Sequence, residues 1–374
     1  MSDNNYELTR DEYTEYIYNE ICFGEPANVQ TPEDVTEGIS RAIELDARPV
    51  FLEGLSARLT QLGIECSPDD TEIMLSEVKK RYKSVLGKTC PRTVKEWCRG
   101  TTPGITNFQN HYDLCFALEM DYKQTAVFFQ KHYLAMPFNI KNSTDAVFLY
   151  CMYHKKPYSS VNELLEKSKK FMFQEKAHTS TSQIANMIFN IDDDEKFLQY
   201  LSEHCYSNEQ QFQLARSIIR KEIEIVRKRL VKYEYERILS PERLGSLTIE
   251  ALLGIKYQGS DKKIRNSKLP KRFTKSLPND VTLGKIINGD VALYDLLRKT
   301  LMLLKFYNFY YEADNCDKYT IGGNLMDFYE ETNNVLASCG FAQIYLCHPF
   351  DCLLMYCANS YDPIDTLYCV MQNG

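Results

Sequence analysis

The chain has 374 residues and a formal net charge of −7, from 51 acidic and 44 basic side chains. This length exceeds what one small core needs, and an apolar content of 44% suffices for two well-packed modules. With only 16 glycines and 13 prolines, extended disorder is not expected. The acidic balance excludes nucleic-acid binding through overall charge, so such a role must depend on local basic stretches.

Helical sequence patterns follow one another along the first half of the chain. The leucines of 51–64 (Leu52, Leu55, Leu59 and Leu62) recur at the spacing of a helix face that packs on a core. Residues 68–87 place acidic side chains early and basic side chains late, as helix dipoles favour. We expect helices over 32–44, 51–64, 68–87, 108–120, 121–134, 143–155 and 159–173.

The second half of the chain is also predicted to be helical. Residues 178–240 are interpreted as a connector of two or three helices, and the last of them, RSIIRKEIEIVRKRLVKYEYERIL, has charges that alternate in sign, as in a long amphipathic helix that bridges two modules. The last of these helices carries an apolar stripe formed by Ile219, Ile223, Val226 and Leu230. The segment KYTIGG (318–323) is the only plausible β-hairpin fragment. The sequence therefore predicts an all-α protein.

Residues 125–151 and 332–357 resemble each other. Each segment has an aspartate followed by a Tyr-Cys pair at the same spacing, and a weaker match lies upstream, at 91–100 and 279–289. Two copies roughly 200 residues apart indicate a duplicated module, because solenoids need several repeats at a short period. The matched residues are Thr125, Pro137-Phe138, Asp145 and Tyr150-Cys151 in the first copy, and Thr332, Pro349-Phe350, Asp351 and Tyr356-Cys357 in the second.

A short run from Thr93 to Arg99, between Pro91 and Gly100, precedes a longer apolar helix, which is the order of a helix-turn-helix core. In such a core the short helix leaves its N-terminal half free to enter a major groove. We expect Gly100 to supply the positive φ of the turn. Val94, Trp97, Leu114, Phe116 and Leu118 would be buried, while Arg92, Thr93, Lys95, Glu96 and Arg99 would face outward.

These residues resemble a known family. The runs TVKEWCRG, NFQNHYDLCFALEM and DYKQTAVFF are similar to phage-repressor-like helix-turn-helix domains of the xenobiotic-response-element type. They look most like uncharacterised regulators of low-GC Gram-positive bacteria and their mobile elements. The resemblance covers about 80 residues in each half and implies repressor-like modules that bind DNA. Unlike the family, SEVKKRYKSVLG lacks the usual Ser/Thr-Gln-x-x-Leu-Ala pattern, and the second copy offers only Lys285 and Asn288 as outward polar groups.

The repeat and the resemblance together divide the chain into four parts. We expect an N-terminal helical extension over 1–65 and a first helix-turn-helix-like module over 66–175. A helical connector over 176–260 would join it to a second such module over 261–374.

Basic residues in both modules are candidates for DNA contact. In the first, Arg92, Lys95 and Arg99, with Thr93, could reach phosphates or guanine edges. A basic stretch, 261–275, has seven bases and one acid and could neutralise several phosphates. Its candidate residues are Lys262, Lys263, Arg265, Lys268, Lys271, Arg272 and Lys275, and the second motif adds Lys285.

The sequence therefore predicts a sequence-specific DNA-binding transcriptional regulator, with double-stranded DNA and a second copy of the chain as its expected partners. The alternative is a non-catalytic interaction protein whose degenerate helix-turn-helix folds bind protein partners, in a mobile-element or phage-defence setting. A shared face for Arg92, Lys95, Arg99 and the basic stretch would favour DNA binding, and opposite faces would favour the alternative.

Neither catalysis nor a bound metal or cofactor is expected. No Gly-rich phosphate loop, GxSxG or HExxH motif is present, and the acidic run Asp192–Glu195 is interpreted as a helix start. The 13 cysteines include no Cys-x-x-Cys pair, the N-terminus has no apolar signal segment, and no run of 18 apolar residues occurs. We expect a cytoplasmic protein with reduced thiols and no membrane association.

Overall fold

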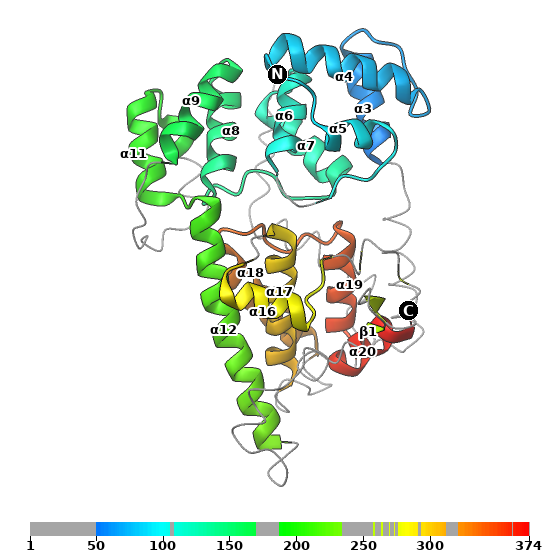
Figure 1. Ribbon diagram of the computed structural model, residues 1–374, viewed down its shortest axis with the longest axis vertical. Coiled ribbons are helices and arrows are strands. Elements are labelled where there is room, and N and C mark those ends of the chain that lie inside the picture. The colour runs from blue at the N-terminus through cyan, green and yellow to red at the C-terminus, as the bar shows by residue number, and fades with distance from the viewer. Residues whose placement is uncertain are drawn as a thin grey trace.

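The computed structural model describes residues 50–104, 108–169, 187–233, 257–258, 263–264, 269, 273, 276–290, 293–311, 321–360 and 362–373. Regular structure within these residues is almost entirely helical, which confirms the all-α prediction (Figure 1). The exception is a short antiparallel pair, β1 (Tyr257–Gln258) and β2 (Lys263–Ile264). The helix predicted over 32–44 lies outside the described residues.

The hairpin predicted at 318–323 is wrong in the part that the structure describes. Helix α18 (Ile321–Ser338) begins inside this segment, so Ile321-Gly322-Gly323 forms its first turn, and 318–320 lie outside the described residues. Leu325, Phe328 and Leu336 of α18 are buried at helical spacing. This longer apolar periodicity outweighs the local strand signal.

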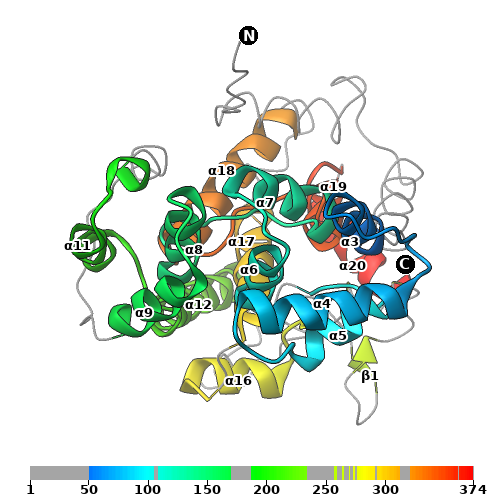
Figure 2. The same ribbon diagram turned by 90° about the horizontal axis from the view of Figure 1, so that it is seen from above.

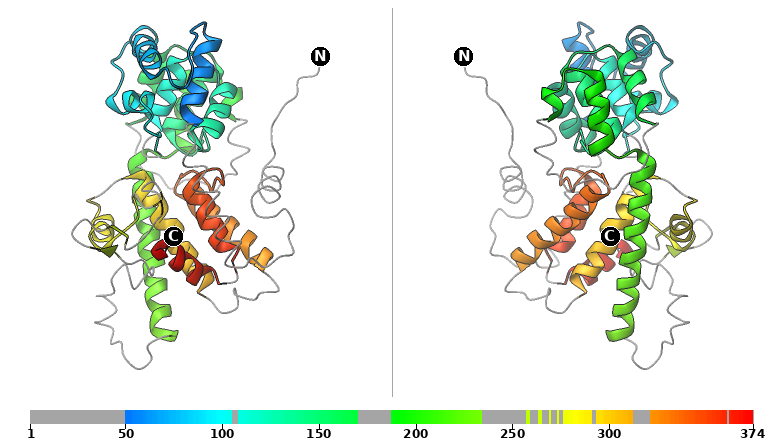
Figure 3. Two further views of the ribbon diagram at one scale, coloured as in Figure 1. Left: turned by 90° about the vertical axis from the view of Figure 1, so that its right-hand side faces the viewer. Right: turned by 90° about the vertical axis from the view of Figure 1, so that its left-hand side faces the viewer.

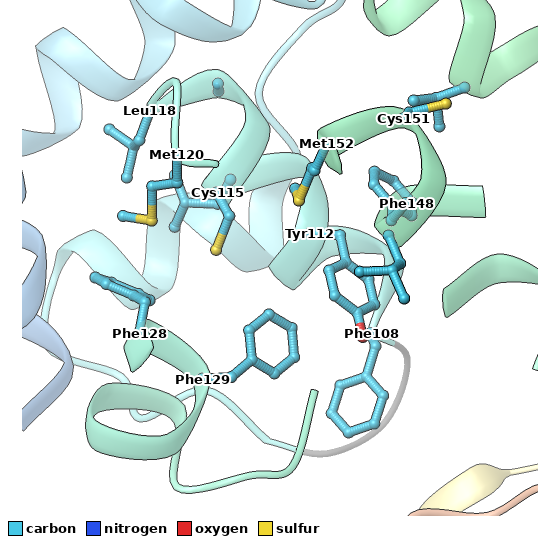
Figure 4. Close-up of a cluster of buried hydrophobic side chains, with 14 of the residues drawn as sticks. Phe108, Tyr112, Cys115, Leu118, Met120, Phe128, Phe129, Phe148, Cys151 and Met152 are labelled. Atoms are coloured by element: carbon cyan, nitrogen blue, oxygen red, sulfur yellow. The ribbon is translucent and has the colours of Figure 1, made fainter. Parts of the chain in front are cut away.

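One hydrophobic core lies in the N-terminal part of the chain. Its centre is aromatic, because the Tyr112 ring stacks on Phe129 and Phe148 at centroid distances of 4.7 and 4.9 Å (Figure 4). Leu55 and Leu59 are fully buried in the same core, so their helix packs with this group although its residues were assigned to an N-terminal extension. The elements around this core are α3 (Val50–Gln61), α4 (Thr71–Val85), α5 (Arg92–Cys98), α6 (Gln109–Ala117), α7 (Tyr122–Phe128), the π-helix η2 (Phe129–Tyr133), α8 (Ser143–Tyr153), α9 (Tyr158–Ser168) and α11 (Asp194–His204).

A second hydrophobic core occupies the C-terminal part and lies below the first in Figure 1. Its central helix, α17 (Tyr294–Tyr310), is buried along nearly its whole length and packs against α12 (Asn208–Tyr233). The remaining helices of this part are α16 (Asp280–Asn288), α18, α19 (Pro349–Ala358) and α20 (Pro363–Asn373).

The described helices of the predicted connector contribute to both cores. α11 buries Phe197 and Leu201 in the first core. α12 buries Ile219, Ile223 and Val226, three residues of the predicted stripe, in the second core. The acidic run before α11 is a helix start as expected, because the Asp193 carboxylate accepts hydrogen bonds from the first backbone N–H groups of the helix.

The two similar segments share a buried contact around their aspartates. Asp145 in α8 accepts a hydrogen bond from the backbone N–H of Asn139, and Asp351 in α19 accepts one from Tyr345, in each case six residues upstream. The Tyr-Cys pairs that follow are buried in both segments. The common origin of the segments stays a prediction that this shared contact supports.

The predicted match of the Pro-Phe pairs is wrong. Pro137-Phe138 lies in the loop before α8, whereas Pro349-Phe350 forms the first turn of α19. Because proline fits both an extended loop and the first turn of a helix, the shared dipeptide does not fix a structural register.

The two cores are joined around the carbonyl oxygen of Gly340, which follows α18. This oxygen accepts a hydrogen bond from Gln211 Nε2 of α12 at 2.8 Å and another from Asn139 Nδ2. Gln211 Oε1 in turn accepts a hydrogen bond at 2.9 Å from the Nδ2 atom of Asn142, which is the N-cap residue of α8. Gly340 has a φ of +71°, and a Cβ added there would lie 2.4 Å from Gln211 Nε2, so glycine is required for this close approach.

Replacement of Trp97 by alanine should destabilise the first core by about 3–5 kcal/mol, because the indole is 4% exposed and its loss leaves a cavity. Urea unfolding followed by circular dichroism would measure the change. Ile73→Ala, at a side chain that is 47% exposed on α4, should stay within about 0.5 kcal/mol of the wild type. Equal stabilities for the two variants would contradict the packing described for α5.

Candidate nucleic-acid interface

α5 lies at the position predicted for the recognition helix. Pro91 precedes it with extended backbone, and Gly100 just after it has a φ of +96°. A positive φ is unfavourable for residues with a Cβ, so glycine allows the chain to turn away at the end of the helix. The predicted short helix and its turn are therefore both present.

Aromatic packing holds α5 on the first core. The Trp97 indole lies 4.6 Å from the His111 ring of α6 and 6.0 Å from the Phe51 ring of α3, measured between centroids. Val94, one turn earlier, is completely buried. These contacts determine which face of α5 points toward the core and therefore which face points toward solvent.

A buried polar cluster anchors the loop between α4 and α5. Lys88 Nζ donates to Asp113 Oδ2 of α6 at 2.6 Å and to the Tyr158 hydroxyl of α9 at 2.5 Å, and this hydroxyl donates to Asp113 Oδ1 at 2.6 Å. Burial raises the pKa of Asp113, while the hydrogen bonds from Lys88 and Tyr158 oppose that shift. The cluster thus ties the entrance of α5 to two other helices of the core.

The outward face of α5 carries the predicted residues. Arg92, Thr93 and Arg99 are exposed, and Lys95 is half-buried. Arg99 forms an ion pair with Glu96 at 3.2 Å, but both side chains are more than 40% exposed, so solvent screens this pair strongly. Arg92 and Thr93 occupy the first turn of α5, the part of a recognition helix that approaches base edges.

Most of the basic stretch lies outside the described residues. Lys262, Arg265, Lys268, Lys271, Arg272 and Lys275 are not described, and Lys263 is placed only through its backbone in β2. In the second motif, Lys285 is exposed on α16, whose N-cap Asn279 and positive-φ Gly289 delimit the helix.

Both candidate recognition helices lie on one side of the molecule. In Figure 2, seen from above, α4, α5, α16 and β1 lie along the lower edge, and Figure 3 shows α16 and the strand pair on the side of α4. α5 and α16 therefore belong to the same side of the protein. Because most of the basic stretch lies outside the described residues, the question of a face shared by α5 and this stretch stays open.

α12 adds basic residues that the sequence interpretation did not select. Arg216 donates to the Gly289 carbonyl of α16 at 3.3 Å, and Arg220 donates to the Ile287 carbonyl. The available signal was the spacing of four residues between these arginines, which places them on one face of a helix. The alternating charges of the same segment obscure this signal.

The aspartates of the two similar segments differ in charge compensation. Asp145 also accepts from the Tyr112 hydroxyl at 3.0 Å, but burial dominates and raises its pKa to about 7. Burial acts on Asp351 in the same direction, yet the Arg298 guanidinium, at 2.8 and 2.6 Å, holds the pKa of that carboxyl well below its usual range. Asp145 is thus easily protonated, whereas Asp351 is held in an ion pair.

Comparison of the chain with protein-family models, curated proteins and solved structures finds no match. Among the residues that the structure describes, no three or more His, Cys, Asp or Glu side chains are grouped to hold a metal ion. No helix in the same residues combines the length and apolar character needed to cross a membrane.

The pKa of Asp145 predicts a pH-dependent stability. In the folded state the pKa of Asp145 is about 7, above its ordinary value of 3.8, so the folded protein holds this proton more tightly than the unfolded chain. The stability that the bound proton gives to the folded state is therefore lost as pH rises from about 4 to about 7. Over this range the wild type should lose up to about 4 kcal/mol of unfolding free energy relative to Asp145→Asn, which cannot titrate. Chemical unfolding at several pH values would measure this difference, and parallel pH profiles for the two proteins would contradict it.

Proposed function

We propose that the protein is a sequence-specific DNA-binding transcriptional regulator that approaches the major groove with α5. The observation that carries this proposal is the orientation of α5. Trp97 and Val94 face the core, whereas Arg92 and Thr93 in the first turn and Arg99 at the end are exposed. Arginine at such a position can donate two hydrogen bonds to a guanine edge.

The rigidity of the site supports the same proposal. The entrance of α5 is fixed by the Lys88, Asp113 and Tyr158 cluster, and its centre is fixed by the rings around Trp97. A recognition helix held in this way does not need to become ordered when it binds, so little binding energy is spent on ordering it. Dimerisation would align two such helices with successive half-sites and belongs to the same proposal.

The alternative function is protein interaction, and α16 favours it. Val281 at its start is 49% exposed, and Leu293 shortly after it is 57% exposed. Exposed apolar side chains of this size are more typical of a contact with protein than with a phosphate backbone. In this alternative the helix-turn-helix-like folds bind a protein partner and no nucleic acid.

Arg92→Ala should weaken binding to a preferred genomic sequence by about 1–3 kcal/mol and reduce the preference over random duplex, because a bidentate arginine contact discriminates between bases. Fluorescence anisotropy with labelled duplexes at several salt concentrations would measure both affinities.

Arg92→Lys is the matched control because it retains the charge but not the planar fork of donors. It should keep the affinity for random duplex and lose part of the sequence preference. Failure of the intact protein to bind any duplex at about 50 mM salt, where phosphate contacts are strong, would reject the proposal in favour of protein interaction.

A further inference from the structure

The described surface of α12 is more basic than its sequence suggests. Residues 210–228 contain five basic side chains and two acidic ones, Glu222 and Glu224. Glu222 is 8% exposed and accepts a hydrogen bond from Asn308 Nδ2 of α17 at 2.5 Å. Glu224 remains at the surface, where Arg227 pairs with it at 2.9 Å. Folding therefore removes one of the two acids from the surface and leaves the bases.

The helical period arranges these bases beside the buried face. Ala215, Ile219, Ile223 and Val226 pack into the second core and define the inward direction. At about 100° per residue, the three arginines fall within about 40° of one another on one flank of α12, and the two lysines follow on the solvent side. Lys221 and Lys228 are both exposed. We call Arg216, Arg220, Lys221, Arg227 and Lys228 the α12 basic stripe.

The α12 basic stripe borders α16. Arg216 and Arg220 donate to the Gly289 and Ile287 carbonyls at the C-terminal end of α16, the negative end of its dipole. These carbonyls carry no full negative charge, so they offset the positive charges only in part. Glu209, Glu224 and Asp290 are exposed acids near the stripe, and with the buried Glu222 they offset four of its five positive charges, so the described residues keep a small positive excess at the stripe.

The length of the stripe fits a linear polyanion. Arg216 and Arg227 are eleven residues apart, which is about 16 Å along a helix and spans on the order of five phosphates of one DNA strand. α12 extends along the second core, and α16, which the stripe contacts, lies on the same side of the molecule as α5 (Figures 2 and 3).

We propose that the α12 basic stripe binds the phosphate backbone of duplex DNA, so that one chain contacts a duplex through α5 and through α12. This inference rests on the proposed function and extends it. α5 supplies the sequence-dependent contacts, and the stripe supplies an affinity that does not depend on sequence. The contacts through Gly340 hold these two surfaces in a fixed relative orientation.

The test is the double variant Lys221→Ala/Lys228→Ala, because both side chains are exposed and their removal leaves the α12 core face intact. Affinities for the preferred sequence and for random duplex should fall by the same factor. The slope of log affinity against log salt should become shallower by about one for each lost phosphate contact. The control Lys131→Ala/Lys196→Ala removes the same charge from exposed lysines of η2 and α11 and should leave the slope unchanged.

A slope equal to that of the wild type in the α12 variant would overturn this inference, and Arg92→Ala would still report separately on α5. An equal change in the control variant would also overturn it, since the effect would then come from net charge. Preferential loss of binding to polyglutamate, with duplex binding retained, would indicate an acidic protein partner and reject the assignment to DNA. If the intact protein binds no duplex at about 50 mM salt, the proposed function itself fails.

Discussion

A buried carboxyl group needs neighbouring groups that satisfy its hydrogen-bonding capacity, and each of the two similar segments of this protein contains one. Asp145 and Asp351 both hold the loop before their own helix by accepting a backbone hydrogen bond six residues upstream. Each also reaches a helix that is distant in sequence, through Tyr112 in the first core and Arg298 in the second. Loop, helix and core are thereby fixed together.

The different partners of these carboxyl groups give the two similar segments different electrostatic properties. Arg298 and Asp351 are both buried, so each needs the opposite charge of its partner to remain ionised in the core. A tyrosine hydroxyl cannot compensate charge in this way, and Asp145 therefore titrates near neutral pH. Similar sequence segments thus produce the same backbone contact but respond differently to pH.

The contacts at the junction connect these local structures to the proposed function. Asn139 belongs both to the loop held by Asp145 and to the junction between the cores. Its backbone N–H donates to Asp145, and its side chain donates to the Gly340 carbonyl. Tyr345, whose N–H binds Asp351, donates its hydroxyl proton to the Gln130 carbonyl of the other part at 3.0 Å. The loops organised by the buried carboxylates are therefore the loops that join the cores. Because they join the cores, they also determine how α5 and α12 are oriented relative to each other.

The sequence by itself determined the helical class and the inward face of α5. Apolar spacing is a local property, so Leu55, Leu59, Val94 and Trp97 could be assigned to a core from their periodicity alone. Proline and glycine at the ends of α5 could be recognised for the same reason, since their backbone preferences are local.

Only the tertiary structure decided which charges remain at the surface and how the cores meet. Burial of Glu222 depends on Asn308, which is 86 residues away, and the junction depends on Gln211 and Gly340, which are 129 residues apart. The packing of distant helices also decides the partners of the two aspartates. It places Arg298 beside Asp351, whereas the hydrogen bonds to Asp145 come from Tyr112 and Asn139, which carry no charge. Such contacts leave no periodic signal in the sequence, because their partners are selected by the packing of whole helices.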